Sequence, residues 1–138
     1  WNDAVAINLT GSFLGAKHQI AEMARHGGGS VIFTSTFVGY SSSFPGVAAY
    51  AASKGGLIQM TRWLATTMAP KVRVNAVAPG GVFRATPEPF LSRYVARTPL
   101  ARMAREDDMK GAVAYLASDL AAYVTGQCIA VDGGWTAW

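Results

Sequence analysis

At the centre of the chain lies the stretch Val72-Arg73-Val74-Asn75-Ala76-Val77-Ala78, which the turn Pro79-Gly80-Gly81 follows. A short, nearly continuous run of apolar and β-branched residues is typical of a strand that is buried on both faces, as in a parallel sheet. A second run of this kind occupies residues 30–34, and a third occupies residues 127–131. The sequence therefore predicts three strands, each ended or preceded by glycine or proline.

Helical patterns separate these three runs. Apolar residues recur at helical spacing over residues 1–25 and again over residues 48–68, which are rich in alanine. Shorter helices are expected near residues 88–96 and over residues 106–117, and a Gly/Ser/Pro-rich loop is expected over residues 37–47. The alternation of helices and strands predicts an α/β fold, in which a parallel sheet carries helices on both faces.

Composition narrows the class of protein. The chain has 138 residues, of which 51% are hydrophobic and 14% are charged, so a single globular domain over residues 1–138 is expected. It has no run of about 18 uninterrupted apolar residues, so no membrane span is expected. The single cysteine, Cys128, excludes an internal disulfide and reads as a small hydrophobe in a strand. It suits a reducing compartment, and we expect the protein in the cytoplasm.

The formal net charge of +4 has a local origin. The segment 84–105 holds five arginines and one acid, and basic and acidic residues balance in the rest of the chain. A nucleic-acid binder more often shows basic stripes interleaved with exposed aromatic residues, so no nucleic-acid partner is expected. A solvated basic loop and a site for an anionic substrate both remain open as interpretations of this segment.

A phenol and an ammonium lie four residues apart in Tyr50-Ala51-Ala52-Ser53-Lys54, near the start of the expected helix 48–68. Residues at this spacing share a helix face, with Cβ atoms roughly 5–6 Å apart. An ammonium held beside a phenol favours the phenolate form, which makes the phenol a usable general acid/base. Two exposed side chains on a solvated helix would show the same pattern, so the pair alone does not decide its function.

Several motifs in one order remove that ambiguity. The chain resembles the C-terminal half to two-thirds of a compact short-chain dehydrogenase/reductase, which has a Rossmann-like, doubly wound parallel sheet. The resemblance rests on Ile7-Asn8-Leu9-Thr10-Gly11, Gly29-Ser30-Val31-Ile32, Tyr50-Ala51-Ala52-Ser53-Lys54-Gly55-Gly56, Arg73-Val74-Asn75-Ala76-Val77-Ala78-Pro79-Gly80, Tyr123-Val124-Thr125-Gly126-Gln127 and Val131-Asp132-Gly133-Gly134.

The resemblance implies an enzyme that moves hydride reversibly between NAD or NADP and a carbonyl/alcohol substrate. It implies that Tyr50 exchanges the proton with the substrate oxygen, that Lys54 holds the nicotinamide ribose and favours the phenolate, and that Asn8 anchors a water in the proton relay. A hydroxyl after the first strand would bind the substrate oxygen. The family usually has serine there; strand register favours Thr36 over the preceding Ser35, and both stay open.

Cofactor and substrate contacts are also implied by the resemblance. The turn Pro79-Gly80-Gly81 would lie at the carboxyl end of a strand, and the backbone of Val82 would meet the nicotinamide carboxamide. Many members place a threonine four residues after the first of these glycines, where this chain has Arg84, which could face the pyrophosphate or an acidic substrate.

Residues 82–103 correspond to the variable segment that covers the substrate in the family. Because the basic segment overlaps it, a small anionic substrate is expected, with Arg84, Arg93 and Arg97 as candidate contacts. The resemblance also implies self-association, to a homodimer or homotetramer, through the first and second long helices.

The sequence lacks the family's Gly-rich dinucleotide fingerprint. Gly27-Gly28-Gly29 follows a helix and precedes a strand, which is the wrong order for cradling a pyrophosphate on a helix N-terminus. We therefore expect residues 1–138 to be the catalytic part of a longer Rossmann-type domain, with an unpaired edge on the strand at residues 30–34. The alternative is a catalytically silent half-domain that acts only in association with other chains.

Overall fold

The computed structural model describes residues 1–41 and 45–138, so part of the expected loop 37–47 lies outside the described residues. Its sheet has three parallel strands in the order β1-β2-β3. The predicted strands are confirmed, with small shifts in their ends. The strands are β1 (Gly29–Thr34), β2 (Val72–Pro79) and β3 (Cys128–Val131).

Helices occupy the predicted places, with differences at their first turns. The helix expected over residues 1–25 contains a π-helical turn, in which the amide of Gly11 donates to the carbonyl of Ala6, five residues earlier. The helix expected from residue 106 begins with a 3-10 turn (Glu106–Met109), because the Asp108 carboxylate accepts from the Arg105 amide at 2.6 Å. The helices are α1 (Asn2–Val5), the π turn (Ala6–Thr10), α2 (Gly11–Arg25), α3 (Ala48–Met68), α4 (Phe90–Ala96) and α5 (Lys110–Ala117).

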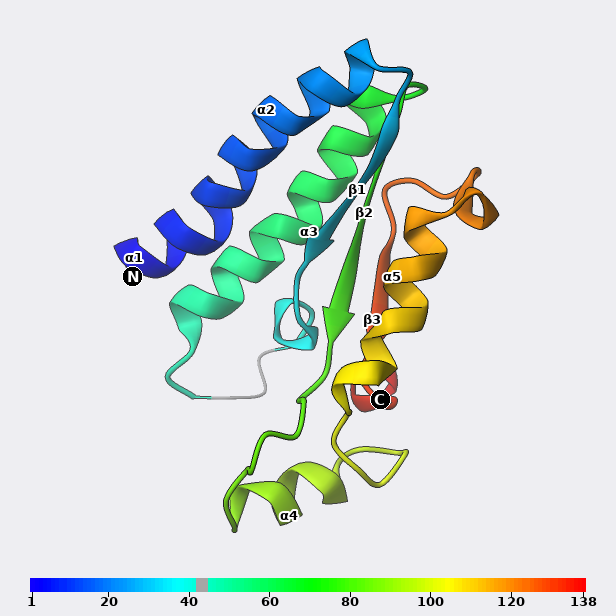
Figure 1. Cartoon of the computed structure of the whole chain (residues 1–138). Coiled ribbons are helices and arrows are strands. Elements are labelled where there is room, and N and C mark those ends of the chain that lie inside the picture. Colours follow the sequence, from blue (N-terminus) through cyan, green and yellow to red (C-terminus); the bar gives the residue numbers. More distant parts are fainter. Residues whose placement is uncertain (42–44) are drawn as a thin grey trace.

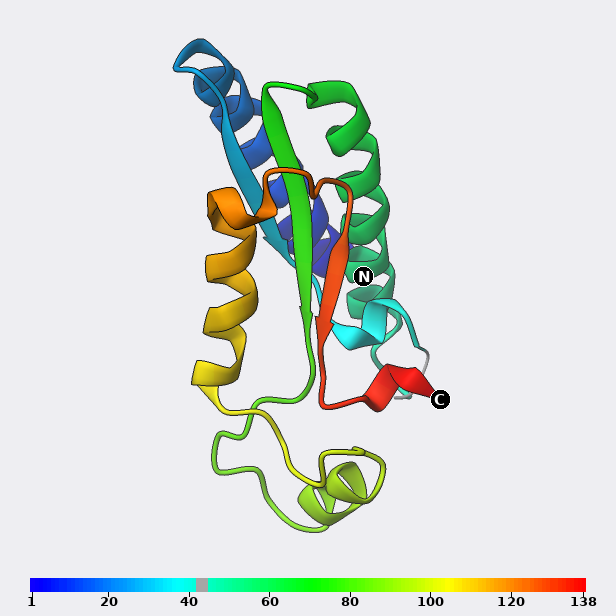
Figure 2. The same cartoon turned by 90° about the vertical axis from the view of Figure 1, so that its right-hand side faces the viewer.

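Two layers of helix enclose the sheet, as predicted. Figures 1 and 2 show α2 and α3 side by side on one face and α5 on the other. Alternation along β1 explains the two cores, since Val31 and Phe33 pack toward α2 and α3, whereas Ile32 packs against Leu116 of α5 and its neighbours. Burial of these apolar faces is the main force that holds the helices to the sheet.

Polar residues of β2 hold the connection that leads to β3. Arg73 donates to the carbonyl of Leu116 at 3.0 Å and to that of Ser118 at 3.2 Å. Asn75 is fully buried; it donates to the carbonyl of Val124 at 2.8 Å and accepts from the amide of Gln127 at 3.0 Å. These contacts align β3 with β2, so that Val131 lies opposite Pro79 in the register.

The carboxyl ends of the strands therefore meet at one edge of the sheet. The first turn of α3 and the segment that carries α4 lie at this same end (Figure 1). At the other side of β1, a groove of about 440 Å³ runs between the strand and α2, because β1 pairs with no second strand within residues 1–41 and 45–138. None of the helices described here is both long and apolar enough to cross a bilayer.

Candidate active site

Tyr50 and Lys54 lie on the first two turns of α3, beside the end of β1. The ammonium Nζ of Lys54 lies 5.9 Å from the centroid of the Tyr50 ring, within the range of a cation–π contact. The same ammonium donates to the carbonyl of Thr34 at 2.8 Å, which fixes its position at the carboxyl edge of the sheet. Partial burial lowers the pKa of Lys54. Tyr50 keeps 39% of its surface exposed, so a reactant can reach it.

Asn8 reaches the same segment through an unpredicted residue. Its Nδ2 donates to Oγ of Ser53 at 3.2 Å, and that hydroxyl donates to the carbonyl of Tyr50 at 2.8 Å. Asn8 lies in the π-helical turn, and its own carbonyl accepts from Ser12 Oγ at 2.7 Å. π-helical turns inside α-helices are frequent at functional sites because they redirect a side chain and its backbone. Ser53 is completely buried. A serine inside an alanine-rich helix was the signal that could have identified it.

The two hydroxyls that follow β1 point to different neighbours. Ser35 donates through Oγ to the carbonyl of Lys54 at 2.9 Å, which turns its side chain toward α3. Thr36 lies in extended backbone, and its Oγ1 lies 3.4 Å from the carbonyl of Pro79, a long contact at the end of β2. Because β1 ends at Thr34, strand geometry no longer forces these two side chains to opposite faces. Their separate hydrogen bonds direct them to different neighbours instead.

The Pro79-Gly80-Gly81 turn is tightly packed on both sides. A Cβ at Gly80 would lie 2.8 Å from Cα of Asp132, and a Cβ at Gly81 would lie 2.8 Å from both Met103 Cε and Tyr94 Cζ. The close approach of other segments of the chain, rather than a positive φ, explains why these two positions are glycine. The amide of Gly81 also donates to the Tyr94 hydroxyl at 2.5 Å.

Val82 forms a single parallel bridge with Ala104, which ties the two ends of the segment 82–103 together. The bridge uses the carbonyl of Gly81 and the amide of Phe83, at 2.9 Å each. In this pattern the amide and carbonyl of Val82 itself point away from the bridge. They take no part in the two bonds to Ala104.

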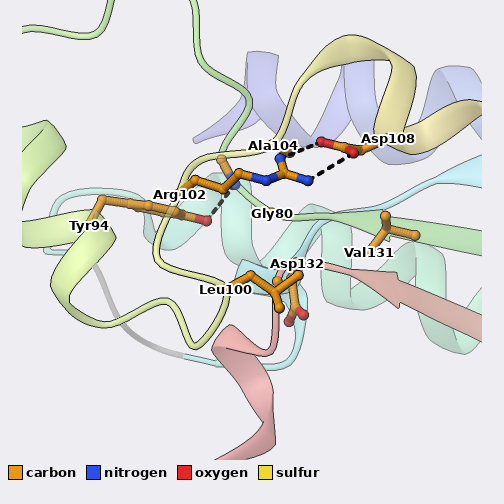
Figure 3. A pocket seen from close by; sticks show the side chains of 10 residues that line it. Gly80, Tyr94, Leu100, Arg102, Ala104, Asp108, Val131 and Asp132 are labelled. Carbon is orange, nitrogen blue, oxygen red and sulfur yellow. Dashed lines mark hydrogen bonds and ion pairs between the residues drawn. The ribbon is translucent and has the colours of Figure 1, made fainter.

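A small cavity of about 160 Å³ lies behind this turn (Figure 3). Arg102 closes one side of it and binds both carboxylate oxygens of Asp108, at 2.6 and 3.0 Å. This bidentate pair lowers the pKa of Asp108 to about 2. Asp132 accepts from the amides of Gly134 and Thr136, which shapes the chain after β3. Because this cavity is small and its charged lining residues Arg102 and Asp108 pair with each other, we interpret it as a packing feature of the turn.

A second cavity, of about 700 Å³, lies beside α4. Its described lining residues are Pro45, Phe90, Arg93, Tyr94, Ala96, Arg97 and Trp135. Tyr94 and Trp135 stack with ring centroids 4.4 Å apart, and the Arg97 guanidinium lies 5.1 Å from the Trp135 ring centroid. Arg84 is not in this lining; it forms an exposed ion pair with Glu106 at 3.2 Å.

Residues next to the catalytic candidates in sequence pack against the aromatic side chains that line the second cavity. The Phe37 ring, directly after Thr36, lies 5.4 Å from Trp135 and 6.1 Å from Tyr94 between ring centroids. Ala51, directly after Tyr50, packs against the same aromatic cluster. Sequence reasoning missed Tyr94 and Trp135 as part of this site, because they come from the basic segment and from the C-terminal tail.

No cluster of three or more His, Cys, Asp or Glu side chains suited to a metal ion occurs in the part of the chain that the structure describes. A phenol, a fixed ammonium, two hydroxyls and a backbone turn lie instead at one edge of a parallel sheet. Open α/β sheets bind ligands at this edge. Such a set of groups can move a proton and orient a reactant.

Comparison with known proteins agrees with this chemistry. A sequence profile of the family described as Enoyl-(Acyl carrier protein) reductase matches residues 1–136. The chain is 37% identical over 142 residues to the cis-4-hydroxycyclohexanecarboxylate dehydrogenase of Sinomonas cyclohexanicum, covering 99% of this chain and 57% of that enzyme. It is 36% identical over 148 residues to the 2-(S)-hydroxypropyl-CoM dehydrogenase 3 of Xanthobacter autotrophicus, covering 99% and 58%. It is 37% identical over 139 residues to the 3-oxoacyl-(acyl-carrier-protein) reductase FabG of Thermotoga maritima, covering 97% and 56%.

Solved structures show the same fold. A short chain dehydrogenase from Leptospira borgpetersenii with bound NAD+ superposes with a TM-score of 0.93 at 35% identity, over 98% of this chain and 56% of that one. A structure described as a gluconate 5-dehydrogenase from Beutenbergia cavernae, with bound NADP, superposes with a TM-score of 0.92 at 36% identity, over 100% and 58%. The chain thus spans little more than half the length of the relatives that it matches.

Proposed function

Because the chain belongs to the short-chain dehydrogenase/reductase family, we propose that it carries the proton-transfer half of an NAD(P)-dependent oxidoreductase that interconverts an alcohol and a carbonyl. The observation that supports this most strongly is the Lys54 ammonium, held by the Thr34 carbonyl and lying over the Tyr50 ring. The named relatives are dehydrogenases and reductases, and two structural neighbours contain NAD+ or NADP.

Tyr50 acts as the general acid/base. In alcohol oxidation its phenolate takes the hydroxyl proton, and in carbonyl reduction its phenol returns that proton to the substrate oxygen. The positive charge of Lys54, 5.9 Å from the ring centroid, stabilises the phenolate. The bound nicotinamide supplies or accepts the hydride, so the protein needs only orientation and one proton.

Thr36 serves as the hydroxyl that binds the substrate oxygen. This choice is supported by its place at the end of β2, since its Oγ1 lies near the Pro79 carbonyl at the ligand-binding edge. Ser35 positions the helix instead, through its bond to the Lys54 carbonyl. Asn8 orients the Tyr50–Lys54 segment through Ser53 and anchors the water of the proton relay.

The residues at the turn fit a nicotinamide cofactor. The amide and carbonyl of Val82, which the bridge to Ala104 does not use, match the donor and acceptor of a carboxamide. Tyr50 and Lys54 would hold the nicotinamide ribose. The residues that would choose between NAD and NADP are not among these groups.

The outer faces of α2 and α3 support self-association to a homodimer or homotetramer. Phe13 and Trp63 are 42% and 55% exposed and line an apolar groove of about 330 Å³ with Leu64 and Met68. Exposed apolar patches of this kind often mark interaction surfaces. We propose a cytoplasmic enzyme, because the lone Cys128, partly buried in β3, suits a reducing compartment.

The test is turnover by the whole protein with NAD+ or NADP+ and a panel of secondary alcohols that includes 4-hydroxycyclohexanecarboxylate. We expect nicotinamide reduction, and we expect Lys54→Met to lower kcat by roughly 100-fold or more, because the phenolate loses its counter-charge. Lys110→Met is the control, since it removes an exposed ammonium that is paired only with Asp107 at 2.6 Å. A protein that self-associates but turns over no alcohol or ketone in the panel would favour the silent half-domain.

A further inference from the structure

The basic segment divides into arginines that are paired and arginines that are not. Arg84 is paired with Glu106, and Arg102 binds Asp108 in a bidentate manner. Within residues 1–41 and 45–138, no carboxylate lies within ion-pair distance of Arg93 or Arg97. Arg105 has no ion pair in this part of the chain either, but only Arg93 and Arg97 line the cavity of about 700 Å³.

Arg93 and Arg97 line the same cavity. They are four residues apart at the end of α4, so their side chains share one face of the helix. Arg97 is further oriented by its contact with the Trp135 ring, 5.1 Å from guanidinium to ring centroid. A guanidinium ordered in this way binds a planar carboxylate with less loss of freedom than a mobile one.

The other described residues of the lining are apolar or aromatic. Phe90, Tyr94 and Trp135 supply ring surfaces, and the Tyr94 hydroxyl is already engaged with the Gly81 amide. Small-molecule pockets of about 300–1,000 Å³ are typically apolar with a few polar groups that fix orientation. The lining therefore suits an apolar body, such as a saturated ring or a short chain, that carries one anionic group.

The cavity also lies at the right end of the molecule. Its aromatic floor touches Phe37, the residue after Thr36, and packs against Ala51, the residue after Tyr50. A substrate long enough to extend from the cavity past this cluster would have its anionic group at α4 and its reacting oxygen at the edge that holds Thr36 and Tyr50.

We propose that Arg93 and Arg97 form the carboxylate subsite of this pocket, and that the substrates are hydroxy or oxo carboxylic acids with an apolar body between the two groups. The identity of the reacting end rests on the proposed function. The carboxylate subsite itself needs no turnover, and it can be tested by binding alone.

The experiment measures binding of cyclohexanecarboxylate and of its neutral isostere, cyclohexanecarboxamide, to the whole protein by calorimetry. We expect the carboxylate to bind more tightly, and we expect Arg93→Gln or Arg97→Gln to weaken it by roughly 10- to 100-fold while leaving the amide unchanged. Arg97→Lys keeps the positive charge but loses the planar guanidinium, so its affinity for the carboxylate should lie between those of the wild type and Arg97→Gln. Arg25→Gln, at the far end of α2, removes an exposed charge and should change neither ligand.

A second measurement separates this inference from the proposed function. The ratio of kcat/KM for 4-hydroxycyclohexanecarboxylate to that for its carboxamide should fall in the Arg93 and Arg97 variants. Turnover without any preference for the acid would overturn the inference and leave the proposed function intact. Selective binding of the carboxylate without turnover would support the carboxylate subsite and contradict the proposed function. If the same variants weaken the binding of an acidic acyl carrier protein and leave the binding of cyclohexanecarboxylate unchanged, the arginines form a protein-docking site and the inference is wrong.

Discussion

Asn75 is the residue whose removal should most damage the alignment of β3 with β2. It has no exposed surface, and its side chain bonds to the Val124 carbonyl and the Gln127 amide. Asn75→Ala leaves the Gln127 amide without this partner and leaves the Val124 carbonyl with only a long contact from Arg73, at 3.5 Å. Loss of a partner costs about 1–3 kcal/mol for a buried group, so the two groups set an upper range of about 2–6 kcal/mol.

We expect the lower part of that range, about 2–4 kcal/mol, because Arg73 and Thr125 still hold the same connection to β2. That loss is a large fraction of the roughly 5–15 kcal/mol that stabilises a typical domain. The assay is urea unfolding followed by circular dichroism. Gln127→Ala is the matched control, since it removes an exposed amide of the same connection and should stay within about 0.5 kcal/mol of the wild type. An Asn75→Ala protein as stable as the control would refute the reasoning.

Two further predictions concern the hydroxyls that follow β1 and the Arg102–Asp108 pair. Thr36→Ala should lower kcat by roughly 10-fold or more with little loss of stability. Ser35→Ala should instead lower the free energy of unfolding by about 1 kcal/mol, because its hydrogen bond to the Lys54 carbonyl is lost. Steady-state kinetics and urea unfolding of both variants check this, and the reverse pattern would exchange the two roles. Asp108 should titrate near pH 2, because Arg102 lowers its pKa from 3.8 to about 2. Since the folded pKa is depressed, the stability that this pair contributes is fully present above about pH 4 and is lost as the pH falls through 2. An NMR titration of the carboxyl that gives a midpoint near 4 would show that the pair does not form.

Regular elements were predictable because their causes are local. Helix α3 is observed over Ala48–Met68, the range that its apolar spacing indicates, because alanine-rich periodicity and the following Pro70 act within the segment itself. The π turn at Ala6–Thr10 was not predictable, because the contacts of Asn8 and Ser53 that accompany it join residues 45 positions apart.

The family motifs identify residues but do not indicate their structural roles. Arg73 and Asn75 were noticed as part of a family motif, yet their bonds to Ser118 and Val124 show a structural role that no local pattern indicates. The basic segment was likewise recognised as a surplus of charge. Only the structure separates the paired Arg84 from Arg97, whose ring partner comes from the C-terminal tail.

The most direct test of the central claim is the rate of nicotinamide-dependent alcohol oxidation by Tyr50→Phe. This change keeps the ring that faces the Lys54 ammonium and removes only the hydroxyl that exchanges the proton. We expect kcat to fall by about 10²–10⁴-fold with unchanged nicotinamide affinity and an unchanged circular dichroism spectrum, while Tyr123→Phe, at a fully exposed position, keeps the wild-type rate. A Tyr50→Phe enzyme that retains a rate within tenfold of the wild type would contradict the assignment of Tyr50 as the general acid/base.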